Sequence, residues 1–312
     1  MQNDNPAKQA SSIPRSRARG DAALFSRIVR IAGAISTPIA ARLALQIWRM
    51  TRRSPVPPRE HEWLQSATST FESINRRTIR LHEWGNKSDP TVFLVHGWGG
   101  RGAQMAAFAS PLAQSGHRVI AFDLPGHGES SGRATDMFEC HLVLQALRER
   151  YGTPRAVIAH SFGGMVATFA MRQNLGANRV VLIGTPSDGN RVIAGYINWL
   201  SVPTRISECM LALVKKRLGD DVFDQLSPEF HAPHIKTPCL IIHDEEDLDV
   251  PIAAAERVEA LWEGAKLVRT SKLGHRRILR DEGVVQRANE FICGSQALLS
   301  RSQSRQVENK DS

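Results

Sequence analysis

A serine in the stretch "VIAHSFGG", residues 157–164, stands among small residues directly after a short apolar run. Ser161 has Ala159 two positions before it and Gly163 two positions after it, which is the spacing of a nucleophile elbow. In such an elbow a sharp strand-to-helix turn lifts the serine hydroxyl above a sheet, and only small residues fit at those two positions. The start of the following helix directs backbone N–H groups toward developing negative charge. The stretch therefore predicts a nucleophilic serine.

A serine hydroxyl is a weak nucleophile, so it needs a base that is itself oriented by an acid. "IIHDEEDLDVP" supplies Asp247, 86 residues after Ser161, and "SKLGHRRIL" supplies His275, 28 residues after Asp247. The order Ser, Asp, His is the one expected for this type of elbow. A spacing of 28 residues holds one helix and one strand, so the acid and the base are predicted at the same edge of a sheet.

Other side chains compete for these roles. The acid loop holds five acidic residues between positions 244 and 249, and Asp188 follows an earlier strand. His160 adjoins the serine, and a neighbour on an elbow points elsewhere, so a structural role is predicted for it. His96 and His127 are predicted to hydrogen-bond loop backbone, and Asp123 is predicted to order the turn that contains Gly126 and Gly128. The remaining candidates for the acid are Asp244, Glu245, Glu246 and Asp249.

The elements that must position these residues alternate along the chain. Apolar runs typical of buried strands occur at 91–97, 117–126, 155–161, 179–186 and 238–244, with an alternating run at 76–85 and a weaker run at 265–271. Helical periodicity separates most of them, at 136–152, 164–174, 253–264 and 281–293. This alternation predicts an α/β fold with a mostly parallel central sheet and helices on both faces.

Five ordered motifs make residues 61–294 resemble the α/β-hydrolase superfamily: "FLVHGWGG", "FDLPGHGES", "AHSFGG", "HDEEDLDVP" and "LGH". The resemblance implies that the backbone N–H groups of Trp98 and Phe162 form an oxyanion hole, and that residues 187–236 form a small helical lid. It also implies Asp247 as the acid, because this residue opens the family's Asp-x-x-Val-Pro pattern. The sequence departs from the family at Ala159, where the motif has glycine, and at Asp244, where the family commonly has glycine after histidine.

The net charge of +9 is concentrated in an N-terminal arm. Residues 1–60 carry 11 Lys and Arg against 3 Asp and Glu, whereas residues 61–312 carry 29 against 28. A neutral main body argues against a nucleic-acid surface. Residues 1–20 and the tail 295–312 are polar and predicted to be disordered. No metal-ligand spacing occurs, and "GWGGRG" lacks the Gly-Lys-Ser/Thr of a phosphate-binding loop, so no metal or cofactor is predicted.

The arm, residues 1–58, is predicted to contain an amphipathic helix that starts with Thr37 as N-cap and Pro38 in the first turn, followed by a proline-rich linker. Ile39 and Met50 would belong to its apolar face, with Leu43 and Ile47 between them. Packing of this helix on the domain is favoured, and peripheral contact with an anionic membrane is the alternative. The longest uncharged run has 11 residues, against roughly 20 for a spanning helix, and a cytoplasmic location is expected.

The favoured hypothesis is a serine hydrolase that cleaves a carboxylic ester or related acyl bond through Ser161, His275 and Asp247. Aliphatic residues in the segment 187–236, together with Tyr196 and Trp199, predict a small apolar substrate with a short or medium chain. Two alternatives remain. An acyltransferase would use the same three residues with an alcohol or thiol as acceptor, and a binding protein would keep the fold without catalysis.

Overall fold

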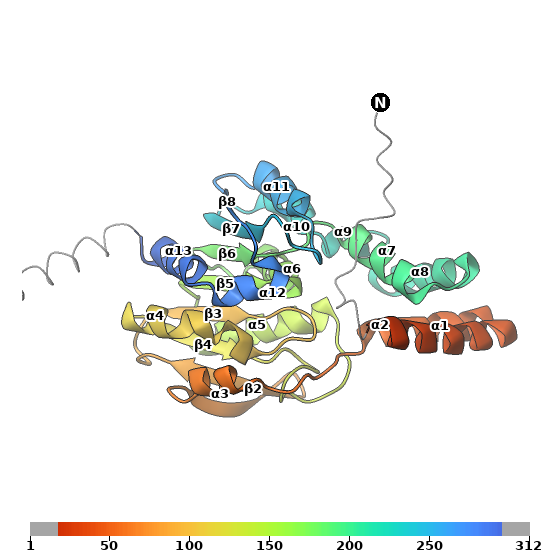
Figure 1. The fold of residues 1–312 in the computed structure, drawn as a ribbon, viewed down its shortest axis with the longest axis horizontal. Coiled ribbons are helices and arrows are strands. Elements are labelled where there is room, and N and C mark those ends of the chain that lie inside the picture. The colour runs from red at the N-terminus through yellow and green to blue at the C-terminus, as the bar shows by residue number, and fades with distance from the viewer. Residues whose placement is uncertain (1–17, 295–312) are drawn as a thin grey trace, which may run out of the picture.

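The computed structural model describes residues 18–294, and its centre is one eight-stranded sheet (Figure 1). The strand order is β1-β2-β4-β3-β5-β6-β7-β8. The pairs β1–β2 and β2–β4 are antiparallel, and the pairs from β4–β3 to β7–β8 are parallel. The strands are β1 (Thr68–Ile74), β2 (Arg77–Trp84), β3 (Thr91–Val95), β4 (Arg118–Phe122), β5 (Ala156–His160), β6 (Val180–Ile183), β7 (Cys239–Asp244) and β8 (Lys266–Thr270).

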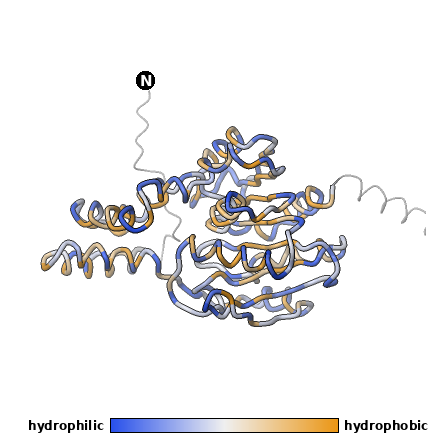
Figure 2. Tube along the Cα trace, turned by 180° about the vertical axis from the view of Figure 1, so that it is seen from behind, coloured by the Kyte–Doolittle hydropathy of each residue, from blue (hydrophilic) through white to orange (hydrophobic). Residues whose placement is uncertain are grey.

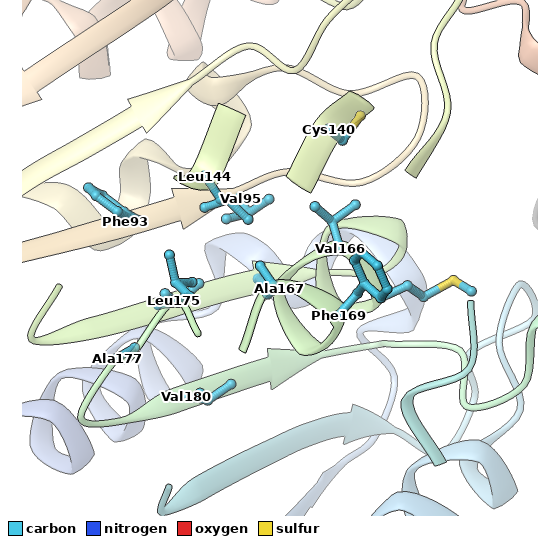
Figure 3. Packing of buried hydrophobic residues seen from close by; sticks show 14 of the residues in the cluster. Phe93, Val95, Cys140, Leu144, Val166, Ala167, Phe169, Leu175, Ala177 and Val180 are labelled. Carbon is cyan, nitrogen blue, oxygen red and sulfur yellow. The ribbon is translucent and has the colours of Figure 1, made fainter. Parts of the chain in front are cut away.

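Helices cover both faces of this sheet, and β3 shows why its strands are apolar throughout. Phe93 and Val95 point into the core on one face, against α5 and α6 (Figure 3), and Leu94 points into the core on the other. The first face is covered by α5 (Met137–Tyr151), α6 (Phe162–Arg172) and α11 (Ile252–Leu261). The second is covered by α3 (Pro58–Leu64), η2 (Gly102–Phe108), α4 (Ala109–Gln114), η4 (Ile278–Arg280) and α13 (Glu282–Cys293), with α12 (Gly274–Arg277) preceding η4.

A group of helices, called here the helical module, extends from the sheet domain (Figure 1). It joins two segments far apart in the sequence: α1 (Ala18–Ile35) and α2 (Thr37–Arg49) from the N-terminal arm, and α7 (Gly189–Leu200), α8 (Thr204–Leu218) and α9 (Val222–Gln225) from the insertion. These helices share a separate apolar core, which contains Val29, Ala44, Tyr196 and Met210. The insertion ends with α10 (Pro228–His231) and η3 (Ala232–His234), which pack beside α6 and α11.

The structure corrects the prediction for the arm in three respects. Residues 18–20, included in the predicted disordered start, belong to α1, and the N-cap of α2 is Ser36 instead of Thr37. The buried face of α2 is mainly alanine, and Ile39 is 54% exposed and Met50 46% exposed. Ile47 is buried and Leu43 packs against the same core, so the predicted face is confirmed at these two positions and wrong at Ile39 and Met50. The predicted segments 1–17 and 295–312 lie outside the described residues.

The strand β1 is absent from the prediction because its sequence has no buried face to reveal it. It is an edge strand in which only Ile74 is buried. The other seven strands lie within the predicted runs. Across residues 18–294, every helix is too short or too polar to cross a lipid bilayer.

Candidate active site

Ser161 lies between the end of β5 and the start of α6, in a backbone conformation that is unfavourable for a residue with a side chain. Its φ is 53° and its ψ is −123°. The turn is held by the Ser161 N–H, which donates to the Ile183 carbonyl over 2.9 Å. A Cβ at Gly163 would come within 2.5 Å of the His96 carbonyl oxygen, so this position requires glycine. The elbow thus requires a small residue at this position because the backbone of α6 lies against the backbone that follows β3.

The structure brings the three predicted residues together in one line of hydrogen bonds. The Nε2 atom of His275 lies 2.9 Å from the Ser161 Oγ, and its Nδ1 lies 2.7 Å from Oδ2 of Asp247. His275 is held at the start of α12, and Asp247 lies in the loop after β7. Side-chain exposure is 11% for His275 and 1% for Asp247, so the pair is shielded from water.

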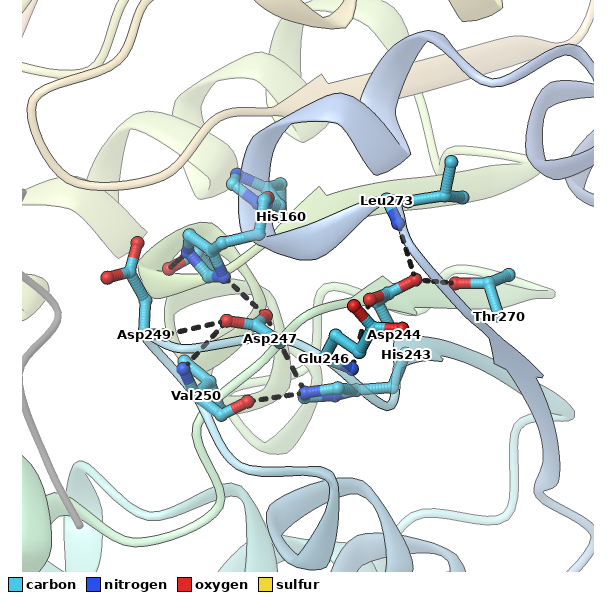
Figure 4. A network of polar contacts seen from close by, with 11 residues as sticks. His160, His243, Asp244, Glu246, Asp247, Asp249, Val250, Thr270 and Leu273 are labelled. Carbon is cyan, nitrogen blue, oxygen red and sulfur yellow. Dashed lines mark hydrogen bonds and ion pairs between the residues drawn. The ribbon is translucent and has the colours of Figure 1, made fainter. Parts of the chain in front are cut away.

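Hydrogen bonds in the acid loop distinguish Asp247 from its nearest competitor (Figure 4). The second oxygen of Asp247, Oδ1, accepts the N–H groups of Asp249 and Val250 over 2.8 and 2.9 Å. The Asp244 carboxylate instead accepts the Thr270 hydroxyl and the Leu273 N–H over 2.9 and 3.1 Å. Asp244 therefore ties β7 to β8 and to the loop that carries the histidine, and it makes no contact with the imidazole.

The pKa of Asp244 reflects this role. Burial opposes ionisation, but hydrogen bonds from the Gly274 N–H, the Thr270 hydroxyl and other loop donors outweigh it and hold the pKa of Asp244 below its ordinary value. The charged form of Asp244 is thus the form that the loop stabilises.

Two further histidines support the site. His160 lies beneath the histidine loop, where its Nε2 lies 2.8 Å from the His275 carbonyl oxygen. Burial, reinforced by the neighbouring His275, lowers the pKa of His160 well below its usual range, so the ring is neutral and donates this hydrogen bond. His243 Nε2 donates to the Val250 carbonyl over 2.8 Å and lies 3.7 Å from Oδ2 of Asp247. Its proximity to the acid is a contact that the sequence alone does not signal.

Three side chains in the loops around the serine have the structural roles predicted from the sequence. His96 donates from Nδ1 to the Gly97 carbonyl and accepts the Leu124 N–H at Nε2, over 2.7 and 2.9 Å. His127 donates from Nδ1 to a loop carbonyl over 3.0 Å. The Asp123 carboxylate accepts two loop N–H groups, each over 2.7 Å. These interactions fix the loops that follow β3 and β4.

Trp98 and Phe162, the predicted oxyanion-hole residues, contact each other on the wall of the cavity that contains Ser161. Their rings meet edge to face with centroids 5.0 Å apart, and both residues line the same cavity as Ser161. Phe162 is the first residue of α6, where a helical N–H has no acceptor within its own helix. Among the backbone bonds of the described loops, neither the Trp98 N–H nor the Phe162 N–H has a carbonyl partner.

A cavity of about 1290 Å³ opens above Ser161 and His275. Its walls come from the sheet domain and from the helical module, including Trp48 of α2 and Val192 and Tyr196 of α7. Trp48 packs edge to face on Tyr196 with ring centroids 4.7 Å apart, and the Tyr196 hydroxyl donates to the Ala44 carbonyl over 2.5 Å. The contribution of α2 is missing from the sequence prediction, which assigns the cover to residues 187–236 alone.

The described residues include no group of three His, Cys, Asp or Glu side chains arranged to hold a metal ion. A mostly parallel sheet flanked by helices, with a hydrogen-bonded serine at the turn after β5, is the arrangement of an α/β hydrolase.

Comparison with known proteins agrees with this fold. Residues 90–203 match the family model described as alpha/beta hydrolase fold. A putative lipase from Acinetobacter baumannii superposes with a TM-score of 0.59 at 19% identity, covering 80% of this chain and 99% of the other. A bacterial membrane phospholipase A superposes with a TM-score of 0.58, also at 19% identity, covering 88% and 97%. The chain therefore has the α/β-hydrolase fold, and residues 90–203 are similar to that family.

Curated relatives match over shorter segments. A pimeloyl-[acyl-carrier protein] methyl ester esterase from Methylococcus capsulatus is 38% identical over 99 residues, 31% of this chain and 38% of the relative. A lysophosphatidylserine lipase from Danio rerio is 26% identical over 211 residues, 61% of this chain and 53% of the relative. The chain therefore spans about half or less of the length of these relatives.

Proposed function

We propose that this protein is a serine hydrolase that cleaves carboxylic esters through an acyl-enzyme intermediate. Ser161 is the nucleophile, His275 the general base and acid, and Asp247 the residue that orients the imidazole. The observation that carries the proposal is the continuous line of hydrogen bonds from Asp247 through His275 to Ser161, 2.7 and 2.9 Å long, beside a cavity large enough for a substrate.

In the first half-reaction, the Ser161 Oγ attacks the ester carbonyl while its proton passes to Nε2 of His275. The carbon–alkoxide bond then breaks, and the leaving alkoxide takes that proton from Nε2 and departs as an alcohol. In the second, a water molecule attacks the acyl-enzyme as its proton passes to Nε2. The acid product leaves as Ser161 regains the proton. Asp247 accepts a hydrogen bond from the Nδ1–H group of His275, which holds the required tautomer and stabilises the imidazolium form.

The negative charge on the tetrahedral intermediate requires donors that are already in position. The backbone N–H groups of Trp98 and Phe162 serve as these donors in the proposal, since both residues flank Ser161 and neither N–H is used by a loop carbonyl. Each such donor contributes about 3 kcal/mol to transition-state stabilisation.

The substrate class follows from the cavity walls. Aliphatic and aromatic side chains from α2 and α7, such as Trp48, Val192 and Tyr196, favour an apolar acyl or alkyl group. The apolar group proposed is a chain of short or medium length. The curated relatives named as an ester esterase and a lipase support an ester bond as the target. Residues 187–236, with α2, act as the lid over this site.

Labelling with a fluorophosphonate probe tests the nucleophile directly. Wild-type protein is expected to react, and Ser161→Ala is expected not to. Ser187→Ala is the matched control, because Ser187 is also a buried serine on the cavity wall, but its hydroxyl accepts a hydrogen bond from Arg257 instead of meeting a histidine. Failure of folded wild-type protein to react would contradict an activated serine and favour the non-catalytic alternative.

The acyl acceptor is tested with a panel of esters of increasing chain length, in water and with an added alcohol. Free acid as the main product supports hydrolysis. Predominant transfer to the alcohol at low alcohol concentration would instead identify an acyltransferase that uses the same three residues.

A further inference from the structure

The outer face of α1 carries a narrow stripe of exposed aliphatic side chains. Leu24, Ile28, Ile31 and Ile35 are 55%, 40%, 57% and 82% exposed. Ile39, in the first turn of α2 just past the bend between the helices, is 54% exposed and is counted with this stripe. The spacing of four, three and four residues places the four α1 side chains within about 60° of one another at 3.6 residues per turn. Figure 2 shows hydrophobic residues recurring along this part of the molecule.

The stripe is distinct from the face that stabilises the helical module. On the inner side of α1, Val29 is fully buried, and a Cβ at Gly33 would come within 2.6 Å of the Ile206 side chain of α8. The ion pair between Asp21 and Arg52 holds the start of α1 beside the residues that follow α2. The helix is therefore packed in place through its inner face, and the exposed aliphatic side chains are not needed for that packing.

Positive charge borders the stripe. Arg27 and Arg42 are exposed and lie within one helical turn of stripe residues. Arg30, further round α1, instead donates to the Ser201 carbonyl over 2.5 Å and so belongs to the packing of the helical module. Over residues 21–49, where the structure describes the side chains, Asp21 is the one acidic residue, and it is paired with Arg52. An aliphatic ridge flanked by arginines has the composition of a helix that lies in the interface of an anionic membrane.

The same helices form a wall of the cavity. Phe25 of α1 and Leu45, Ile47 and Trp48 of α2 line the space that contains Ser161. A membrane or protein that binds the outer face of α1 would therefore be separated from the cavity only by α1 and α2.

We propose that this stripe docks the protein on the surface of an anionic phospholipid bilayer, with Arg27 and Arg42 at the headgroups. In that position the helical module delivers apolar substrates from the lipid phase to the cavity. The delivery of substrate rests on the proposed function, whereas the docking does not. A second copy of the chain fits less well, because two stripes pressed together would bring arginines of like charge against each other.

Cosedimentation of the full chain with phospholipid vesicles tests the docking without reference to activity. Vesicles of phosphatidylcholine and phosphatidylserine in equal amounts are compared with vesicles of phosphatidylcholine alone. The double variant Ile31→Ser/Ile35→Ser is expected to bind the anionic vesicles on the order of tenfold to a hundredfold more weakly than wild type. Leu261→Ser is the matched control, since Leu261 is a 44% exposed aliphatic residue on α11, outside the helical module.

The charges provide a second, independent variant. Arg27→Gln/Arg42→Gln is expected to weaken vesicle binding and to reduce the salt dependence of that binding. This variant keeps the proposal testable if Ile31→Ser/Ile35→Ser folds poorly. Deletion of residues 1–58 would be a weaker test, because it also removes a wall of the cavity.

The expected result is binding to anionic vesicles that both double variants impair and Leu261→Ser does not, with unchanged labelling of Ser161 and unchanged hydrolysis of a water-soluble ester. Absence of binding by wild type, or equal binding by the stripe variant, would overturn the proposal. A dimer that the stripe variant dissociates in sedimentation equilibrium would also overturn it and assign the stripe to a second copy. If wild-type protein is not labelled at Ser161, the proposed function is contradicted, but the conclusion on vesicle binding still stands.

Discussion

Replacement of Asp247 by asparagine is the sharpest test of how the site works. In the native structure Oδ1 accepts two N–H groups, from Asp249 and Val250, and Oδ2 accepts from Nδ1 of His275. An asparagine must place its oxygen at the two N–H donors, so its NH₂ group faces the imidazole. The ring then presents an unprotonated Nδ1 and carries its proton on Nε2, where it cannot accept the proton of Ser161.

The cost follows from this wrong tautomer. The geometry of the loop is preserved, since the two hydrogen bonds to Oδ1 remain, but the base is lost. A loss of about 10⁴ in kcat is expected, equivalent to about 5.5 kcal/mol of transition-state stabilisation, because the corresponding change in other serine enzymes has this size. Steady-state hydrolysis of a p-nitrophenyl ester and the rate of fluorophosphonate labelling are the measurements.

Asp244→Asn is the control within the same loop. Its carboxylate binds Thr270 and Leu273 and does not touch His275, so the expected effect is on stability, about 1–3 kcal/mol from weakened charge-assisted hydrogen bonds. Its kcat should stay within a few-fold of wild type under conditions where it is folded. If Asp247→Asn retains kcat within tenfold, or if Asp244→Asn is the variant that loses it, the assignment of the acid is wrong.

Three further predictions concern the surrounding loops. Gly163→Val should prevent folding or labelling, because its Cβ meets backbone oxygen at 2.5 Å, whereas Ala159→Gly should remain active; soluble yield and labelling distinguish them. Burial lowers the pKa of His96 to about 4, so as the pH falls below about 6.5 the unfolded chain takes up the proton before the folded protein does. The free energy of unfolding in urea should therefore be constant from this group above about pH 6.5 and fall by up to about 1.4 kcal/mol per pH unit toward pH 4. A free energy of unfolding that does not change with pH would refute this. Trp98→Ala keeps the backbone donor, so KM should rise more than kcat falls; a loss in kcat alone would contradict the assignment to the cavity wall.

Much of the fold could be predicted because its strands are buried on both faces. Such strands form continuous apolar runs, and β3 and β5 to β7 lie within runs of that kind. β1 could not be found in this way, since six of its seven residues are at least partly exposed. The other helix of the arm, α1, was not predicted either, because its apolar residues divide between a packed face and an exposed stripe.

Residue types alone indicate the turn at Ser161 and the chain order of Ser161, Asp247 and His275, because a tight turn between a strand and a helix restricts residue types locally. Spacing along the chain does not separate the five carboxylates of the acid loop, and the choice of Asp247 depended on the resemblance to the family's Asp-x-x-Val-Pro pattern. Packing supplies the physical distinction, because Asp244 bonds to Thr270 of β8 whereas Asp247 contacts His275. The tertiary structure also decided that α2 forms a wall of the cavity, because that contact depends on packing between segments about 150 residues apart, as the bond from Tyr196 to Ala44 shows.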